Sequence, residues 1–180
     1  VLADGTEVQS HVPRWMAFAF FVLLFVLSLG LWWSYDPAAG LGEKWVELPW
    51  IPAWGATISL GIDGISLMMI LLTTFIMPLA VMGSWTSIRS RQHAYYALLL
   101  VLTTGMLGVF VSLDLLLFYV MWELMLVPMY FIIGMWGGER RLYASIKFFI
   151  YTFLGSLLML VAVLYIWLSA GKGTGTPSLE

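Results

Sequence analysis

One acidic residue lies in the middle of a long apolar run near the centre of the chain. The run DLLLFYVMWELMLVPMYFIIGMW extends from Asp114 to Trp136 and is long enough to cross a bilayer as a helix. In such a helix Glu123 lies about 13–14 Å from the start, near the midplane of a hydrocarbon layer about 30 Å thick. A carboxyl group is costly at that depth, so its presence predicts a functional group.

The chemistry that suits such a carboxyl group is proton transfer. A carboxyl group in a water-poor place binds its proton more tightly and releases it when a cation approaches. These two properties are the minimum that a proton relay requires. The structural alternative makes Glu123 an anchor that holds two helices together by a hydrogen bond or an ion pair.

Two tyrosines and a proline accompany Glu123 on the same run. Tyr119 and Tyr130 precede and follow it by four and seven residues, which places both within about 40° of it around a helix. They are possible proton-path neighbours, although buried tyrosines commonly just satisfy their hydroxyl groups on a neighbour. Pro128 removes the donor for the Leu124 carbonyl, and a bend with a free carbonyl can recruit water.

The next apolar segment contributes Lys147, which we predict to act with Glu123 as a catalytic residue. If that helix starts near Leu142, Lys147 lies about one and a half turns into it, where it either extends to the lipid headgroups or is a partner inside the helical bundle. Tyr151 and Gly155 follow at intervals of four residues and continue a stripe suited to close helix contact. Tyr151 is a further possible neighbour of the proton path.

The elements that must position these residues are membrane helices. The 180 residues are 62% hydrophobic and 10% charged, whereas a soluble domain carries about 25% charged residues. Apolar runs this long exclude membrane strands, which are about ten residues long and alternate in polarity. The fold class is therefore all-α and integral to the membrane, with five transmembrane helices predicted at 15–33, 64–85, 94–112, 115–136 and 146–168.

Composition excludes several other classes of protein. The net charge of −2 gives no basic surface for nucleic acid. The absence of cysteine excludes disulfides, thiolate metal sites and cysteine-held iron–sulfur clusters. His11 and His93 flank apolar runs, which does not support a haem held by paired histidines inside the membrane. We therefore expect no cofactor and no metal in this chain.

The distribution of lysine and arginine predicts the orientation. One side of the five crossings holds six of these residues and the other holds two, so the richer side is expected to be cytoplasmic. Residues 1–14 are then a cytoplasmic N-terminal segment, and 34–63 and 169–180 are a periplasmic loop and tail. Within 34–63, proline favours loop, with one short strand at 56–60.

Structural roles are predicted for four residues at helix starts and within helices. Asp63 is an expected N-cap, and Asp114 lies in a two-residue link that makes the third and fourth spans antiparallel neighbours. Pro78 is expected to bend the second span, where a threonine hydroxyl, of Thr73 or Thr74, can replace part of the lost bonding. The four structural residues are Asp63, Pro78, Asp114 and Pro128.

Several segments of the chain are recognisable. The runs FYVMWELMLVPMYFIIGMWGG (118–138) and KFFIYTFLGSLLML (147–160) resemble the chain M family of the bacterial proton-pumping NADH:quinone oxidoreductase, complex I, equivalent to mitochondrial subunit 4. The shorter runs VPRW (12–15), LPWIPAWG (48–55) and GIDGISL (61–67) also look like that family. The resemblance covers nearly all of the chain.

This resemblance implies an antiporter-like subunit of fourteen helices, of which the chain looks like a fragment covering about helices two to six. Glu123 matches the family's glutamate on the fifth helix, and Lys147 matches the lysine that opens the sixth. The resemblance also implies a bacterial inner membrane, neighbouring chains L and N, and NADH, FMN, iron–sulfur clusters and quinone held in other subunits. The other lysines and the second glutamate of the family's proton path would lie outside these residues.

Three other functions remain open. The chain could belong to a multisubunit cation/proton antiporter or to a hydrogenase-linked relative. It could be a purely structural helical bundle in which Glu123 only holds helices together. A quinone-binding chain is the weakest alternative, because only His93, Tyr95 and Tyr96 offer a polar group near an interface.

Overall fold

The computed structural model describes residues 12–35, 43–51, 56–88 and 90–174. Five helices and a two-stranded hairpin make up this part of the chain, and the five predicted membrane helices are confirmed in number and type. The elements are α1 (Val12–Ser34), β1 (Glu43–Ile51), β2 (Ala56–Ile62), α2 (Gly64–Ser84), α3 (Gln92–Val111), α4 (Leu115–Trp136) and α5 (Arg141–Thr174).

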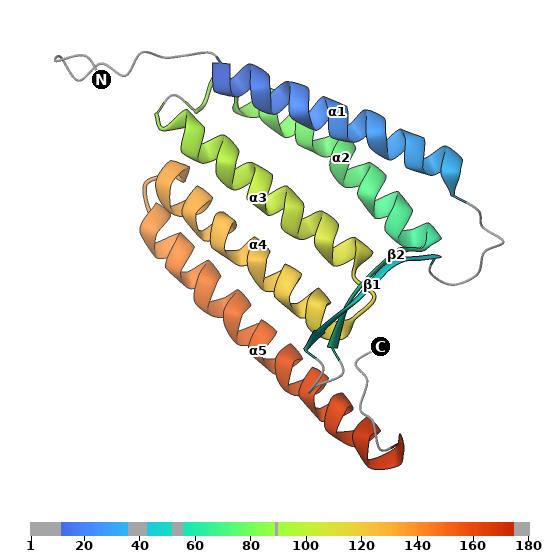
Figure 1. Cartoon of the computed structure of the whole chain (residues 1–180). Coiled ribbons are helices and arrows are strands. Elements are labelled where there is room, and N and C mark those ends of the chain that lie inside the picture. The colour runs from blue at the N-terminus through green and yellow to red at the C-terminus, as the bar shows by residue number, and fades with distance from the viewer. Residues whose placement is uncertain (1–11, 36–42, 52–55, 89, 175–180) are drawn as a thin grey trace.

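The helices lie side by side in chain order, and each packs against the next (Figure 1). Helix α1 also contacts α3. Consecutive helices run antiparallel; from α2 to α5 the connections are short, and the link of Leu113 and Asp114 joins α3 to α4 as predicted, whereas the hairpin lies between α1 and α2. The hairpin lies at one end of this layer, beside the start of α4.

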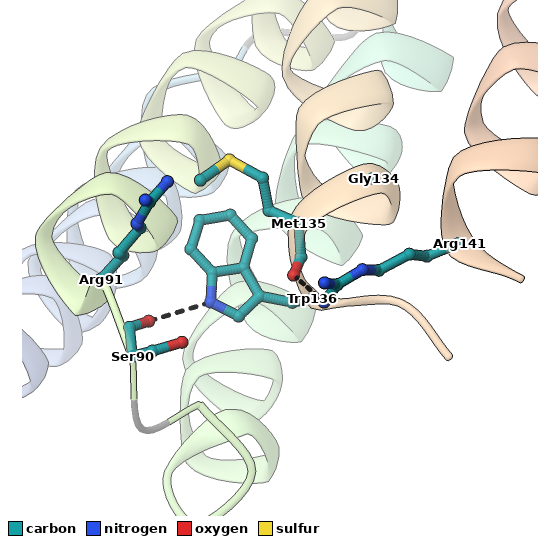
Figure 2. Close-up of a pocket in the computed structure, with 6 residues that line it drawn as sticks. All are labelled: Ser90, Arg91, Gly134, Met135, Trp136 and Arg141. Atoms are coloured by element: carbon teal, nitrogen blue, oxygen red, sulfur yellow. Dashed lines mark hydrogen bonds between the residues drawn. The ribbon is translucent and has the colours of Figure 1, made fainter. Parts of the chain in front are cut away.

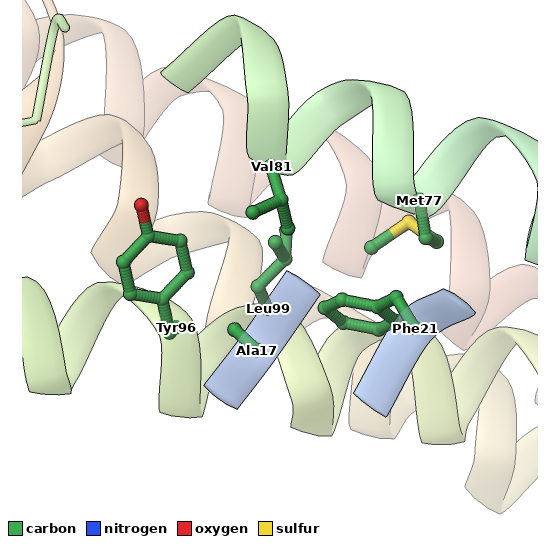
Figure 3. Packing of buried hydrophobic residues seen from close by; sticks show 6 residues of the cluster. All are labelled: Ala17, Phe21, Met77, Val81, Tyr96 and Leu99. Carbon is green, nitrogen blue, oxygen red and sulfur yellow. The ribbon is translucent and has the colours of Figure 1, made fainter. Parts of the chain in front are cut away.

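The largest buried cluster joins the first three helices. It contains Ala17 and Phe21 of α1, Met77 and Val81 of α2, and Tyr96 and Leu99 of α3 (Figure 3). Elsewhere large apolar side chains face outward on all five helices. In water such a surface would be unfavourable, but against lipid tails it is the expected one.

The hairpin corrects one prediction. The expected short strand at 56–60 is present as β2, but Glu43–Ile51, expected to be loop, forms β1 and pairs antiparallel with β2. Proline did not prevent this strand, because Pro49 sits beside a register irregularity where a missing donor is tolerated. Leu60 and Ser112 form a further bridge, so β2 also touches the link before α4.

The cap predicted at Asp63 is present, and Asp114, predicted only as part of a link, is a second cap. The Asp63 side chain accepts a hydrogen bond of 2.6 Å from the Ser66 amide at the start of α2. Its pKa lies below the ordinary value, chiefly because the Ser66 amide bonds to the charged form. Asp114 caps α4 through the amides of Leu116 and Leu117.

The Thr74 hydroxyl does not replace the hydrogen bond that Pro78 removes from α2. The Thr74 hydroxyl donates to the carbonyl oxygens of Ile70 and Leu71, so it does not compensate the Thr74 carbonyl that Pro78 leaves without a donor. It also lies 2.8 Å from the Ser28 hydroxyl of α1, which links two helices inside the bundle.

Helices α3 and α4 approach closely at two glycines. A Cβ atom on Gly105 would lie 2.7 Å from Met125 Cγ and 3.3 Å from the Met121 carbonyl oxygen. A Cβ atom on Gly108 would lie 2.7 Å from Met121 Sδ. The two glycines therefore allow α3 and α4 to pack closely.

The last helix is longer than its apolar run. It begins at Arg141 and continues to Thr174, whereas the predicted span was 146–168. Apolar composition marks the part of a helix that suits lipid, and polar turns at either end extend the helix beyond that part. Residues 1–11, most of the predicted N-terminal segment, and 175–180 lie outside the described residues.

Candidate functional site

Glu123 lies within the continuous helix α4, nine residues after its capping residue Asp114. The side chain is half-buried, and its Oε1 atom is buried with no hydrogen-bond partner in the described part of the chain. A buried carboxylate oxygen without a donor is unfavourable, and a proton, a water molecule or a cation bound to this atom would remove the penalty. Pro128 is fully buried one turn further along α4.

Tyr119 and Ser156 are the polar neighbours on this face. The Tyr119 side chain interacts with the Glu123 carboxylate and with the side chain of Ser156 on α5. Ser156 is 4% exposed, and its hydroxyl donates to the Phe153 carbonyl at 2.9 Å. The three residues form a small polar cluster along the contact between α4 and α5.

Tyr130 belongs to the same side of α4 but not to this cluster. Its ring packs edge-on against Phe149 of α5, with 5.5 Å between ring centroids. A second edge contact joins it to Phe131. Tyr130 therefore marks the continuation of the α4–α5 contact, with apolar neighbours around its ring.

Lys147 lies apart from Glu123 in this structure. Its side chain is exposed on the outer face of α5, with Nζ 5.8 Å from the centroid of the Tyr143 ring. Tyr151 lies on the same face and is 82% exposed, and a Cβ atom on Gly155 would meet nothing within 4 Å. A shallow groove with a volume of about 410 Å³ runs along this face; its lining is Tyr143, Ile146, Lys147, Ile150, Tyr151 and Leu154.

The face of α5 that contacts α4 carries a different stripe. Ser145, Ser156 and Val163 are its most buried side chains. They recur at intervals of 11 and 7 residues, which return to the same side of a helix. Sequence reasoning followed the stripe of Lys147 instead, and the two serines in an otherwise apolar segment were the signal that it missed.

Arg14 is a second residue that sequence reasoning placed differently. It was counted as a topology signal, but its side chain is buried in the first turn of α1. Its Nη2 atom donates to the Ile88 carbonyl across 3.3 Å, and its Nε atom has no hydrogen-bond partner among the described residues. This contact brings the start of α1 to the link between α2 and α3.

The described residues contain no group of three histidine, cysteine, aspartate or glutamate side chains that could hold a metal ion. What they offer chemically is one carboxyl group within a membrane span, beside a phenol and a hydroxyl group. Groups of this kind can bind and pass on a proton, and they can order water.

Two family models match the chain. The first, described as "NADH-ubiquinone oxidoreductase chain 4, amino terminus", matches residues 45–110. The second, described as "NADH:quinone oxidoreductase/Mrp antiporter, TM", matches residues 112–177 and so includes Glu123 and Lys147.

Known proteins show the same likeness. The chain is 47% identical over 159 residues to NADH-quinone oxidoreductase subunit M of Rhodobacter capsulatus, covering 88% of this chain and 30% of that protein. A chain of respiratory complex I from Thermus thermophilus with bound NADH superposes with a TM-score of 0.78 at 30% identity, covering 93% of this chain and 33% of that one.

A chain of the Mrp complex from Dietzia sp. superposes with a TM-score of 0.75 at 22% identity, which shows a shared fold; it covers 91% of this chain and 17% of that one. The chain thus spans about a third or less of the length of the relatives it matches.

Proposed function

Because the chain belongs to the family of antiporter-like membrane subunits of NADH:quinone oxidoreductase, we propose that it forms part of a proton-translocating subunit in which Glu123 carries the proton. The complete protein would then work as one subunit of an enzyme complex. Electron transfer from NADH through FMN and iron–sulfur clusters to quinone would take place in other subunits, and this chain would hold no redox centre.

The observation that supports the proposal is the state of the Glu123 carboxyl group. One of its oxygen atoms is buried without a hydrogen-bond partner among the described residues, and its polar neighbour is Tyr119, which in turn interacts with Ser156 of α5. A buried carboxyl oxygen without a donor can accept a hydrogen bond from ordered water or bind a cation, as a group on a proton path must. Tyr119 supplies a hydroxyl group through which water can be bonded next to the carboxyl.

Lys147 enters the proposal as a residue that acts on the next part of the protein. Its side chain faces away from Glu123, so within this segment it cannot be the cation that displaces the proton. In the longer protein, Lys147 would face the helices that follow and take the proton further along the membrane plane. The lysine that approaches Glu123 would come from outside this segment.

The similarity to subunits of NADH:quinone oxidoreductase also suggests which subunits surround the complete protein and where it lies. We propose that other membrane subunits, namely the chains L and N named for the sister antiporter-like subunits, lie beside the complete protein. The proposed location is the bacterial inner membrane, with the end of the layer that carries Arg14, Arg91 and Arg141 toward the cytoplasm.

The test is Glu123→Gln in a full-length protein that contains this segment, assembled in its complex and studied in sealed membranes. Proton translocation driven by NADH is expected to fall strongly, because glutamine keeps the size of the side chain but cannot exchange a proton. Quinone reduction is followed in parallel, so that loss of coupling is separated from loss of the enzyme.

The matched control is Glu139→Gln, which removes an exposed carboxyl group in the turn between α4 and α5 and should leave proton translocation unchanged. If the Glu123→Gln protein pumps protons at the normal rate, Glu123 is a structural anchor and the proposed relay is wrong.

A second function is favoured by the description of one matching family, which joins the oxidoreductase to the Mrp antiporter. In that case the same carboxyl group would exchange protons for a cation such as sodium. A sodium gradient imposed on proteoliposomes distinguishes the two functions: proton flux that needs sodium supports the antiporter, and flux that needs NADH supports the oxidoreductase.

A further inference from the structure

A polar cavity lies at the end of the helical layer opposite the hairpin. It has a volume of about 310 Å³ and opens where α3 begins, α4 ends and α5 begins (Figure 2). Its lining is Ser90, Arg91, Gly134, Met135, Trp136 and Arg141. Two guanidinium groups and no carboxylate are among these six residues, so the cavity is strongly basic.

Hydrogen bonds fix the walls of this cavity. The indole N–H of Trp136 donates to the Ser90 carbonyl at 3.0 Å and ties the end of α4 to the residues before α3. Arg141 Nη1 donates to the Met135 carbonyl at 2.9 Å, which ties the start of α5 to the end of α4. In Figure 2 the Trp136 ring stands between the two arginines, which approach from opposite sides.

The backbone adds to the positive character of the cavity. Arg91 is the N-cap of α3, with a φ of 51°, and its side chain makes no capping bond to the amides of that helix. No acidic residue occupies the first turn of α3 or of α5. Both helices begin at this end of the layer and direct the positive ends of their dipoles toward it, whereas α4 ends there and its Met135 carbonyl accepts from Arg141.

The surroundings indicate the depth of the cavity in the membrane. Trp136 and Tyr95 pack edge-on, with 5.2 Å between ring centroids, at the ends of apolar helices, where such rings mark the headgroup level. Phe131, three residues before Gly134 in α4, and Leu142, next to Arg141 in α5, present exposed apolar side chains. A ligand in the cavity would meet two guanidinium groups, and the two helices that form its walls carry exposed apolar side chains close by.

We propose that this cavity binds the phosphodiester headgroup of an anionic phospholipid. Guanidinium groups bind phosphate oxygens in paired hydrogen bonds, and basic pockets between membrane helices recognise anionic headgroups. The lipid phosphate would neutralise Arg91 and Arg141 together and join the starts of α3 and α5. A free phosphate ion shares the headgroup chemistry but would gain nothing from the exposed apolar side chains beside the cavity.

The test uses the full-length protein, purified in mild detergent and exchanged into nanodiscs of phosphatidylcholine with a minor fraction of phosphatidylglycerol. The phosphatidylglycerol bound per protein is counted by native mass spectrometry. In the Arg91→Gln/Arg141→Gln protein this binding is expected to weaken about tenfold or more. The matched control, Arg140→Gln, removes a neighbouring exposed arginine that does not line the cavity and should bind normally.

Two further arms separate the possible outcomes. The Arg91→Lys/Arg141→Lys protein keeps the charge and should retain part of the binding, which also shows that changes at these positions are tolerated. Millimolar inorganic phosphate should not displace the lipid. Equal lipid binding by the glutamine protein and the control overturns the proposal, and displacement by inorganic phosphate with no preference for phosphatidylglycerol assigns the cavity to a free anion instead.

Discussion

Asp63 and Asp114 are the N-caps of α2 and α4, and their surroundings indicate that they contribute differently to the stability of the protein. Asp63 accepts one amide hydrogen bond at the start of α2. Asp114 is 1% exposed and uses both oxygens: Oδ1 accepts from the first turn of α4, and Oδ2 accepts from Thr57 of β2 at 3.1 Å. A cap that serves three amides and joins two elements should contribute more to stability than one that serves a single amide.

Replacement of Asp63 by alanine is expected to lower the free energy of unfolding by about 1 kcal/mol at neutral pH. The pKa of Asp63 is lowered in the folded protein, so its contribution is present above the unfolded pKa of about 4 and is lost as the pH falls below it. Thermal unfolding in detergent at about pH 7 and about pH 3 measures this. The wild type and variant should converge at the lower pH; a gap that persists there would show that the effect is not due to the charge.

Asp114→Asn tests the bridging role of the second cap. Asparagine has one acceptor oxygen, so either Thr57 or the first turn of α4 would face an NH₂ group in place of an acceptor. The loss is expected to be about 2–3 kcal/mol, compared with less than about 1 kcal/mol for Asp63→Asn. Equal losses for the two variants would contradict the view that Asp114 joins the hairpin to α4.

At the scale of elements, hydropathy is a strong guide because the bilayer imposes a length on each helix. This is why the five helices and the cap at Asp63 could be predicted, whereas Asp114 was predicted only as part of a link and not as a cap. Strand β1 could not, because its order depends on pairing with β2 and on the Asp114 cap 57 residues beyond Thr57.

The orientation of α5 escaped prediction for a related reason. In a helix that is apolar all round, periodicity does not distinguish the side toward a protein neighbour from the side toward lipid. The stripe of Lys147 and the stripe of Ser156 were equally plausible in sequence, and the packing of α4 selects the second. The cluster of Glu123 with Tyr119 could be predicted from one helix, but its partner on α5 could not.

Gly105→Ala tests whether close packing between α3 and α4 stabilises the protein. The new methyl group would press on Met125 and on the backbone of Met121, and separating α3 from α4 to relieve this should cost about 1–3 kcal/mol. Gly83→Ala in α2 is the matched control, because its methyl group meets nothing within 4 Å. Thermal unfolding in detergent compares the two; a control as unstable as Gly105→Ala would mean that packing between α3 and α4 is not the cause.

At the scale of the whole molecule, the helices form a layer in which α5 is the last member (Figure 1). One side of α5 contacts α4, and the other side exposes the groove around Lys147 and Tyr151. The relatives are about three times as long as this chain, so further helices of the complete protein are expected to cover this side.

Cysteine labelling can test that expectation, because the segment contains no native cysteine. Tyr151→Cys in a cysteine-free full-length protein should react with a membrane-permeant maleimide about tenfold more slowly than after denaturation. Ser145→Cys, at a position that α4 already covers, is the protected reference. Labelling of Tyr151→Cys as fast in the native as in the denatured protein would show that water reaches this side of α5 and that no further helix covers it.

The bond between Thr57 and Asp114 also constrains the order of events on the ribosome. Translation at roughly 5–20 residues per second separates the two residues by about 3–11 s, since they are 57 positions apart. During that interval α2 and α3 can already enter the membrane, while the Thr57 amide has no carboxylate to bond. The bond from Thr57 to Asp114 can therefore form only when α4 has been synthesised. The insertion of α4, which carries Glu123 into the bilayer, also brings the hairpin and the α4 cap together.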